Sequence, residues 1–287
     1  MKHQNSIQQI SSETNQLFSG AKIEWSWAKE SIFSEKFESI LAEPEVKVIS
    51  LRQRTVQLSI AASLIILVGL GTFVMMYSKT VYSPAGSHFT AQFPDSSSVE
   101  LNAETTLSFY PYRWYFQRTV ELKGEGFFSV QKGKKFTVKS AMGETSVLGT
   151  TFNIFARKET YRVFCQTGKV NVKSNSGESV ILLPQQIAIL ESGKLSKEEN
   201  VVSTEHILSW RDNMFLFNAA PITVVLREIE RQYGISIASE KTLSGTISVS
   251  FRKNPDVEKI LSMVCKPLGY NFIKKSEKSY LISAGKN

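Results

Sequence analysis

Residues that carry redox, metal or nucleophilic chemistry are scarce in this chain of 287 residues, which has two cysteines and three histidines. No His or Cys stands at a metal-ligand spacing from another, and no CxxC, HExxH, GxSxG or P-loop motif occurs. The sequence therefore predicts no metal site, no cofactor and no catalytic constellation, and we expect a protein that is not an enzyme.

Two alternatives stay open for the few reactive side chains. Cys165 and Cys265 fall at apolar-patterned positions, which is typical of buried core residues, although an oxidising compartment would allow a disulfide between them. A periplasmic hydrolase would need paired carboxylates. The candidates Glu121 and Glu125 are interpreted as surface charge.

Long runs of like charge are also missing, although the net charge is +8. The residues up to Thr55 carry seven basic and seven acidic side chains, so the positive excess lies further along the chain. Its densest short runs are Lys132-Gly133-Lys134-Lys135 and Lys274-Lys275. Nucleic-acid-binding elements carry larger basic clusters, so we expect a solvated surface and no direct contact with nucleic acid.

One segment has no charge at all. Residues Val56 to Tyr77 form an apolar run of 22 residues, which as a helix would span about 33 Å and cross a hydrocarbon core of ~30 Å. A soluble core helix rarely stays apolar on every face, and a signal peptide starts earlier and is shorter. The sequence predicts one transmembrane helix over residues 55–78.

Flanking charge predicts the orientation of this helix. Lys47, Arg52 and Arg54 precede it, whereas only Lys79 follows it closely, and Tyr77 and Tyr82 suit the outer interface. Basic residues stay on the cytoplasmic side. We therefore expect a single-pass inner-membrane protein with a cytoplasmic N-terminus and a periplasmic C-terminus.

The cytoplasmic head, residues 1–54, is too short for a core of its own. It carries apolar residues at roughly helical spacing, including the aromatic residues Trp25, Trp27, Phe33 and Phe37. Exposed aromatic side chains on a small element suggest a protein partner. Packing on one another or on the membrane interface is the alternative.

After Lys79 the apolar residues alternate at period two, with turn residues between the runs. This pattern predicts a mainly β domain, sandwich-like or roll-like, over residues 79–200. The expected strands are 89–93, 98–101, 106–110, 118–123, 126–131, 136–140, 144–148, 151–156, 161–166, 169–173, 179–183 and 186–190.

Residues 201–287 show a different pattern, which predicts a small α+β domain of order β-α-β-β-α-β-β. The expected helices are 221–233 and 255–268, and the expected strands are 214–217, 235–238, 246–251, 270–274 and 279–282. In the first helix, Val224, Val225, Leu226 and Ile229 form the expected inward face, and Gly234 ends it.

Gly149-Thr150 lies between two predicted strands. A Thr hydroxyl can attack the carbonyl of the preceding residue in a strained turn and convert the amide into an ester. Glycine before it removes a steric obstacle. On the residues alone, an ordinary turn or bulge is the favoured interpretation of the same two residues.

Several of these segments, in this order and spacing, resemble the FecR-type anti-sigma regulators. Residues 93–103 resemble the family's "LPDGS-V-LNA" signature, 118–130 its "R-V-L-GEA-F-V" run, 147–154 its "V-LGT-FNV" element and 168–172 its "GKV-V" element. Ser97 departs from the turn glycine of the first signature. Residues 210–284 resemble the short module that secretins and TonB-dependent receptors carry near their N-termini.

The resemblance implies a cell-surface signalling regulator. Its head would bind an extracytoplasmic-function sigma factor, through Trp25, Trp27, Phe33 and Phe37, and either inhibit it or assist it. Residues 79–200 and the C-terminal module, residues 201–287, would sense the signalling domain of a TonB-dependent outer-membrane receptor. Periplasmic and intramembrane proteases would then free the head, and some relatives cleave themselves at the bond that here joins Gly149 to Thr150.

The main alternative is a membrane-anchored periplasmic binding or scaffold protein without a sigma partner. Its β domain and C-terminal module would bind a polysaccharide or a transporter directly. The head discriminates between the two readings, because a scaffold would not need the aromatic residues found there.

Overall fold

The structure, a computed structural model, describes residues 51–158, 160–199 and 205–284. The predicted head with Trp25, Trp27, Phe33 and Phe37 lies outside these ranges. The first described element is helix α4, Leu51–Met76. Among the described residues, it is the one helix long and apolar enough to cross a membrane, and none of its apolar stretch is buried by protein. This finding fits the predicted single-span membrane anchor.

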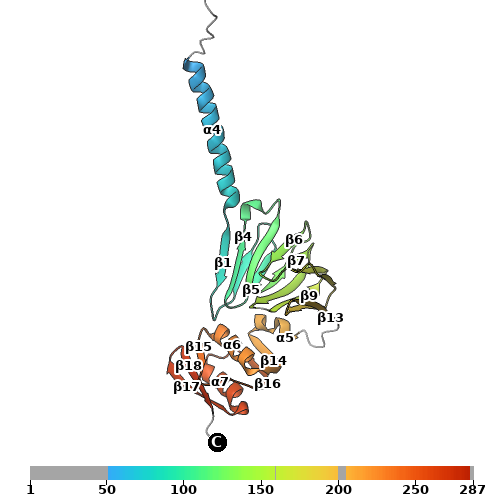
Figure 1. The fold of residues 1–287 in the computed structure, drawn as a ribbon, viewed down its shortest axis with the longest axis vertical. Coiled ribbons are helices and arrows are strands. Elements are labelled where there is room, and N and C mark those ends of the chain that lie inside the picture. The colour runs from blue at the N-terminus through green and yellow to red at the C-terminus, as the bar shows by residue number, and fades with distance from the viewer. Residues whose placement is uncertain (1–50, 159, 200–204, 285–287) are drawn as a thin grey trace, which may run out of the picture. The chain divides into compact units, whose positions relative to one another are not determined.

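The β domain has thirteen strands in one hydrogen-bonded sheet (Figure 1). The mainly β prediction is therefore confirmed. The strands are β1 (Lys79–Ser83), β2 (Phe89–Gln92), β3 (Ser98–Leu101), β4 (Thr105–Phe109), β5 (Arg118–Ser129), β6 (Phe136–Lys139), β7 (Gly143–Val147), β8 (Thr151–Arg157), β9 (Thr160–Thr167), β10 (Val170–Ser174), β11 (Ser179–Leu182), β12 (Ile187–Glu191) and β13 (Lys194–Glu198).

Strand β5 joins two halves of this sheet. Its first part pairs with β4 and β6, and its second part pairs with β3 and β8. The predicted strands 118–123 and 126–131 are therefore one strand, which corrects the sequence reading. The change of partners falls at Gly124, whose φ is +128° and where a Cβ would lie 2.7 Å from the Cβ of Thr105. Only glycine fits this backbone without strain.

The two halves pack face to face on one core. Val120, Val138 and Val172 from the first half and Ile154 and Val163 from the second are all fully buried in the same apolar cluster. Alternating strand residues point to opposite faces of a sheet, which accounts for the period-two pattern of the sequence.

Strand β12 was predicted as 186–190, but its hairpin partner β13 was not. Glu191 pairs with Lys194 across a two-residue turn, in which Ser192 has φ +51° and Gly193 has φ +80°. Two positive φ values are typical of the tight turns that join antiparallel strands. Strand β13 carries three charged residues and is largely exposed, so it lacks the apolar alternation by which a strand is recognised.

The C-terminal domain has the predicted β-α-β-β-α-β-β order. Strands β14 (Met214–Pro221) and β16 (Thr246–Arg252) form one sheet, and β15 (Ser236–Ser239), β18 (Ser279–Ala284) and β17 (Tyr270–Ser276) form another. Helices α6 (Ile222–Tyr233) and α7 (Val257–Cys265) pack on the same apolar core. Two short helices, α5 (Glu205–Leu208) and η2 (Ser209–Asp212), precede β14.

The helix boundaries and faces differ slightly from the expectation. Helix α7 begins at Val257 because the side chain of Asp256 accepts hydrogen bonds from the amides of Glu258 and Lys259 and thereby caps the helix. In α6 the buried face includes Ile222 and Gln232, whereas Val224 is 44% exposed, so its assignment to the core was wrong.

Candidate functional site

Strand β5 is covered on both faces in its second part, from Glu125 to Phe128. Phe128 lies in the core of the β domain, but Phe127 lies in the core of the C-terminal domain, with Trp210 and Phe215. Consecutive residues of one strand therefore contribute to the cores of both domains. The two domains meet here, and we call this contact the junction.

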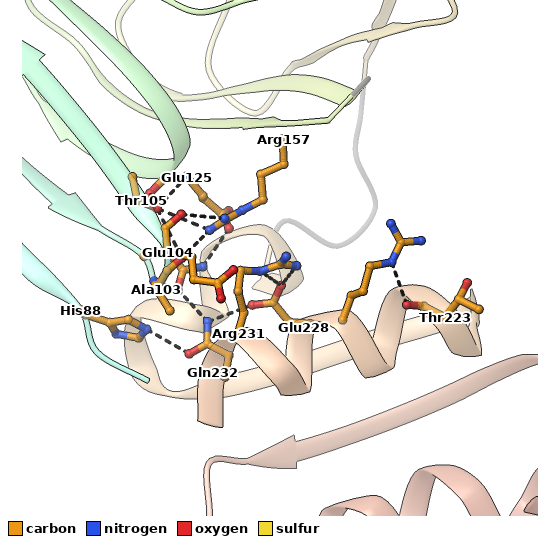
Figure 2. Close-up of polar contacts among 12 residues, drawn as sticks. His88, Ala103, Glu104, Thr105, Glu125, Arg157, Thr223, Glu228, Arg231 and Gln232 are labelled. Atoms are coloured by element: carbon orange, nitrogen blue, oxygen red, sulfur yellow. Dashed lines mark hydrogen bonds and ion pairs between the residues drawn. The ribbon is translucent and has the colours of Figure 1, made fainter. Parts of the chain in front are cut away.

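The junction contains a buried carboxyl group, that of Glu125 (Figure 2). Its Oε2 accepts a hydrogen bond of 2.8 Å from Asn102 Nδ2, and its Oε1 accepts one of 3.0 Å from Asn153 Nδ2. Asn102 follows β3 and Asn153 lies on β8. The interpretation of Glu125 as surface charge was wrong, because the C-terminal domain covers this face of the strand.

Gln232 of helix α6 continues the network into the C-terminal domain. Its Nε2 donates to Asn102 Oδ1 at 2.7 Å and to Glu228 Oε1 at 2.8 Å. Its Oε1 lies 3.2 Å from Nε2 of His88, which stands just before β2. The other carboxylate oxygen of Glu228 pairs with Arg231 at 2.6 Å. Figure 2 shows Glu228 and Gln232 of α6 on the side of the helix that faces the β domain, with His88 beside Gln232.

Two arginines border the network. Arg157, at the end of β8, donates to the carbonyl oxygens of Ala103 at 2.6 Å and Glu104 at 3.0 Å. Arg211 of η2 forms two hydrogen bonds to Glu100 of β3, at 2.6 and 2.9 Å. The Arg211 guanidinium also lies 3.9 Å from the centre of the Phe127 ring. A bidentate, stacked arginine has a specific geometry, and Arg211 thereby links η2 to β3 across the junction.

Burial changes the acid–base properties of two groups at the junction. It raises the pKa of Glu125, with a further increase from the neighbouring Glu228, whereas the hydrogen bonds from the two asparagines and the charge of Arg157 act against this. Burial lowers the pKa of His88, as does the charge of Lys253, against the hydrogen bond with Gln232. Both shifts favour the uncharged form of the group.

The polar groups of the junction bond mainly to one another. Both carboxylate oxygens of Glu125 accept hydrogen bonds within the protein. A cavity of about 510 Å³ beside Gln232 and Lys253 opens to solvent. In the described part of the chain, no group of His, Cys, Asp and Glu residues is arranged to hold a metal ion.

Comparisons with known proteins agree on the two domains. The model of the FecR protein family matches residues 79–171, and the model of the FecR C-terminal region matches residues 214–282. The chain belongs to the FecR family. Together with the solved structures below, this makes it a signalling regulator of the anti-sigma type.

Two crystal structures are similar to this chain. Each is described as that of an anti-sigma factor from Parabacteroides distasonis ATCC 8503. One, at 2.50 Å resolution, has 25% identity and a TM-score of 0.65 over 73% of this chain and 100% of that chain. The other, at 1.65 Å, has 26% identity and a TM-score of 0.64 over 72% and 100%. No curated protein sequence matches the chain.

Gly149 and Thr150 lie in the FecR-matched region, between β7 and β8. Thr150 is buried, and its hydroxyl donates to the carbonyl oxygen of Lys169 at 3.1 Å. A Cβ at Gly149 would lie 2.7 Å from the Cα of Lys132. Close backbone packing therefore requires glycine at this position, independently of any reaction at the bond.

The two cysteines are free and buried, as predicted for core residues. Cys165 lies in the core of the β domain and Cys265 in the core of the C-terminal domain. Burial raises the pKa of each thiol to about 11, so both are unreactive near neutral pH.

The junction residues were missed by the sequence reading, although a signal was present. Asn102 and Asn153 both stand in the FecR-like segments, where polar side chains interrupt apolar strands. A buried asparagine needs partners for its amide. Glu125, which stands between two glycines in the FecR-like segment 118–130, is the acceptor for both asparagine amides.

Proposed function

We propose that this FecR-family chain is a transmembrane anti-sigma regulator. Its head, residues 1–54, binds an extracytoplasmic-function sigma factor in the cytoplasm, and its two folded domains lie in the periplasm. The observation that supports this most is the combination of both FecR-family matches on one chain with an apolar helix that no protein segment buries. Lys47 before α4 and Arg52 and Arg54 in its first turn, against Lys79 alone just beyond its end, support a cytoplasmic N-terminus.

The input side of the proposal is the C-terminal domain. We propose that it contacts the signalling domain of a TonB-dependent outer-membrane receptor. The junction then couples the two domains, because Phe127 packs in the C-terminal core while its strand belongs to the β domain. A receptor that displaces the C-terminal domain would uncover β5 and expose the chain to regulated proteolysis, by periplasmic and then intramembrane proteases.

An affinity capture from native membranes tests the output side. The full chain with a C-terminal tag should retain an alternative sigma factor, and a Trp25→Ala/Trp27→Ala chain should lose it, since aromatic anchors often contribute ~2 kcal/mol or more each. A Val224→Ala chain, altered at an exposed position of the C-terminal domain, is the control. If the native chain retains no sigma factor, the anchored scaffold protein becomes the better account.

A further inference from the structure

An exposed aromatic loop extends from the β domain between β4 and β5. It comprises residues 110–117 and includes the short helix η1, Pro111–Arg113. Tyr112, Tyr115 and Phe116 are 54%, 74% and 78% exposed. Single exposed apolar residues are common, but three large aromatic rings on one short loop form a patch that favours a partner or a membrane.

The loop is held rigidly. The Trp114 ring is buried and stacks on Phe93 with 4.8 Å between ring centres, and it also contacts Phe109 and Phe136 edge to face. The amides of Phe116 and Gln117 both donate to the carbonyl oxygen of Arg113 at 2.9 Å. Because Trp114 is fixed in the core, its neighbours Tyr115 and Phe116 are fixed outside it.

The place of the loop in the sheet is set by strand register. Strand β1 starts at Lys79, three residues after α4 ends at Met76, and Lys79 pairs with Phe109. Paired strands lie about 4.8 Å apart, so the loop leaves the sheet beside the end of the apolar helix. Two contacts agree: Arg113 Nε donates to the carbonyl oxygen of Met75 at 2.6 Å, and the Tyr112 ring lies 5.8 Å from that of Tyr77.

Basic side chains accompany the aromatic rings. A groove of about 380 Å³ beside Phe116 is lined by Lys134, Lys135 and Lys139, with Glu144 as the acidic member. Lys135 pairs with Glu144 at 3.3 Å, and Lys134 Nζ donates to the carbonyl oxygen of Tyr115 at 3.2 Å. The Arg113 guanidinium lies 4.7 Å from the centre of the Tyr110 ring.

We propose that this aromatic loop, residues 110–117, inserts into the interfacial layer of the membrane that α4 crosses, and that Lys134, Lys135 and Lys139 bind anionic phospholipid headgroups beside it. Tyrosine and other amphipathic rings prefer the headgroup level, and cations next to them are attracted to anionic lipid. The loop thereby holds the β domain against the bilayer. The inference requires α4 to span a membrane, but it depends neither on a sigma factor nor on the orientation of the chain.

Depth measurement on the full chain in lipid vesicles tests the proposal. The native cysteines are buried and unreactive, so a nitroxide attached to a Phe116→Cys chain reports on the loop alone. A Met263→Cys chain carries the label on α7 of the C-terminal domain, where Met263 is 46% exposed, and is the matched control. Collisions with oxygen, which concentrates in lipid, are compared with collisions with a water-soluble nickel chelate.

The label at position 116 should lie about 5–10 Å below the headgroup surface, the depth of interfacial apolar side chains, and the label at position 263 should lie in water. Equal nickel accessibility at the two positions would overturn the insertion and leave the loop as a surface for a protein partner. This result would not bear on sigma-factor capture, so the two proposals fail separately.

The lysine component is tested by lipid composition. Adding phosphatidylglycerol to phosphatidylcholine vesicles should increase the depth at position 116, and a Lys134→Gln/Lys135→Gln/Lys139→Gln chain should lose this increase. The replaced side chains are exposed, so we expect the triple variant to fold like the native chain. An equal response of both chains would show that the lysines do not bind anionic lipid.

Discussion

Glu125 sits inside the protein with both carboxylate oxygens hydrogen-bonded to asparagine amides. Replacing it by glutamine removes a charge that burial disfavours and keeps one acceptor oxygen for Asn102, and the new NH2 group can donate to Asn153 Oδ1, which lacks a partner among the described residues, once the Asn153 amide turns over. Replacing it by alanine leaves the amides of Asn102 and Asn153 without this partner. Glu125→Gln should therefore keep or increase the free energy of unfolding at pH 8, and Glu125→Ala should lower it by about 1–3 kcal/mol. Urea denaturation in detergent measures both.

The pH dependence of stability follows from the direction of the same shift. A carboxyl group whose pKa is raised in the folded state contributes its stability below the pKa of the unfolded chain, about 4.3, and loses it as the pH rises through the folded pKa. The difference in unfolding free energy between Glu125→Gln and the native protein should grow from pH 5 to pH 8. His88, with a lowered pKa, acts in the opposite direction in both proteins. A constant difference would contradict a raised pKa.

Thr150 allows a separate test of self-cleavage. If its hydroxyl attacks the Gly149 carbonyl, Thr150→Ala should give one band on a denaturing gel, and Thr150→Ser should retain the two bands of the native chain because serine keeps the hydroxyl. Thr151→Ala, at the neighbouring and more exposed threonine, is the control. Two bands from the Thr150→Ala chain would rule out this hydroxyl as the nucleophile.

The sequence predicted the burial of the apolar-patterned cysteines correctly, but not the burial of the polar residue Glu125. The cysteines were placed in the core correctly, because their neighbours are apolar. Glu125 was interpreted as surface charge, because it stood between the predicted strands 118–123 and 126–131 and the sequence does not show that a second domain covers this part of β5. The alternation of polar and apolar residues in one strand does not show whether another domain covers its polar face.

Helix α4 is the element on which the membrane assignment depends. Leu67, near its middle, is 70% exposed in the protein. Leu67→Arg should impair membrane insertion at a cost of about 2.5–3.5 kcal/mol, and Leu67→Phe should leave it intact. Fractionation of expressing cells gives the result, and a normal membrane fraction of the arginine chain would argue against a spanning helix.

The N-terminal cap of helix α7 is expected to contribute a smaller amount of stability. Its first turn depends on Asp256, which accepts hydrogen bonds of 3.1 and 3.3 Å from two backbone amides. Asp256→Ala should lower the stability of the C-terminal domain by about 1 kcal/mol, and Asp256→Asn should retain most of it. Equal stability of the native and alanine chains in thermal unfolding would show that the cap contributes little.

Helices and strands could be predicted where one face packs on the core and the other face is exposed along the whole element. Most strands of the β domain follow from period-two alternation, and helix α6 follows from its apolar face and Gly234. Strand β1 was not predicted, because it is mostly exposed. The prediction divided strand β5 at Gly124, because a glycine often ends a strand. In the structure the strand continues there and changes its pairing partners, and the glycine is needed because Thr105 packs against it. Strand β13 was missed because its stability comes from pairing with β12 and not from burial.

For the whole molecule, we expect the contacts of the junction to make the two domains unfold as one cooperative unit. Phe127→Ser removes a ring buried in the C-terminal core, at a cost of about 3–5 kcal/mol, and should split thermal unfolding into two transitions. Phe116→Ser, at an exposed ring of the aromatic loop, should keep the native transition in detergent. A single unchanged transition in the Phe127→Ser chain would mean that the domains are not coupled through β5.

The central claim is that the segment before α4 binds a sigma factor. The most direct measurement is the affinity of a purified extracytoplasmic-function sigma factor for the full chain in lipid discs, compared with a chain that begins at residue 51. We expect saturable binding to the full chain and none to the shortened one. Equal binding to both would place the contact outside the head, and no binding of any such sigma factor from the native host would contradict the anti-sigma mechanism.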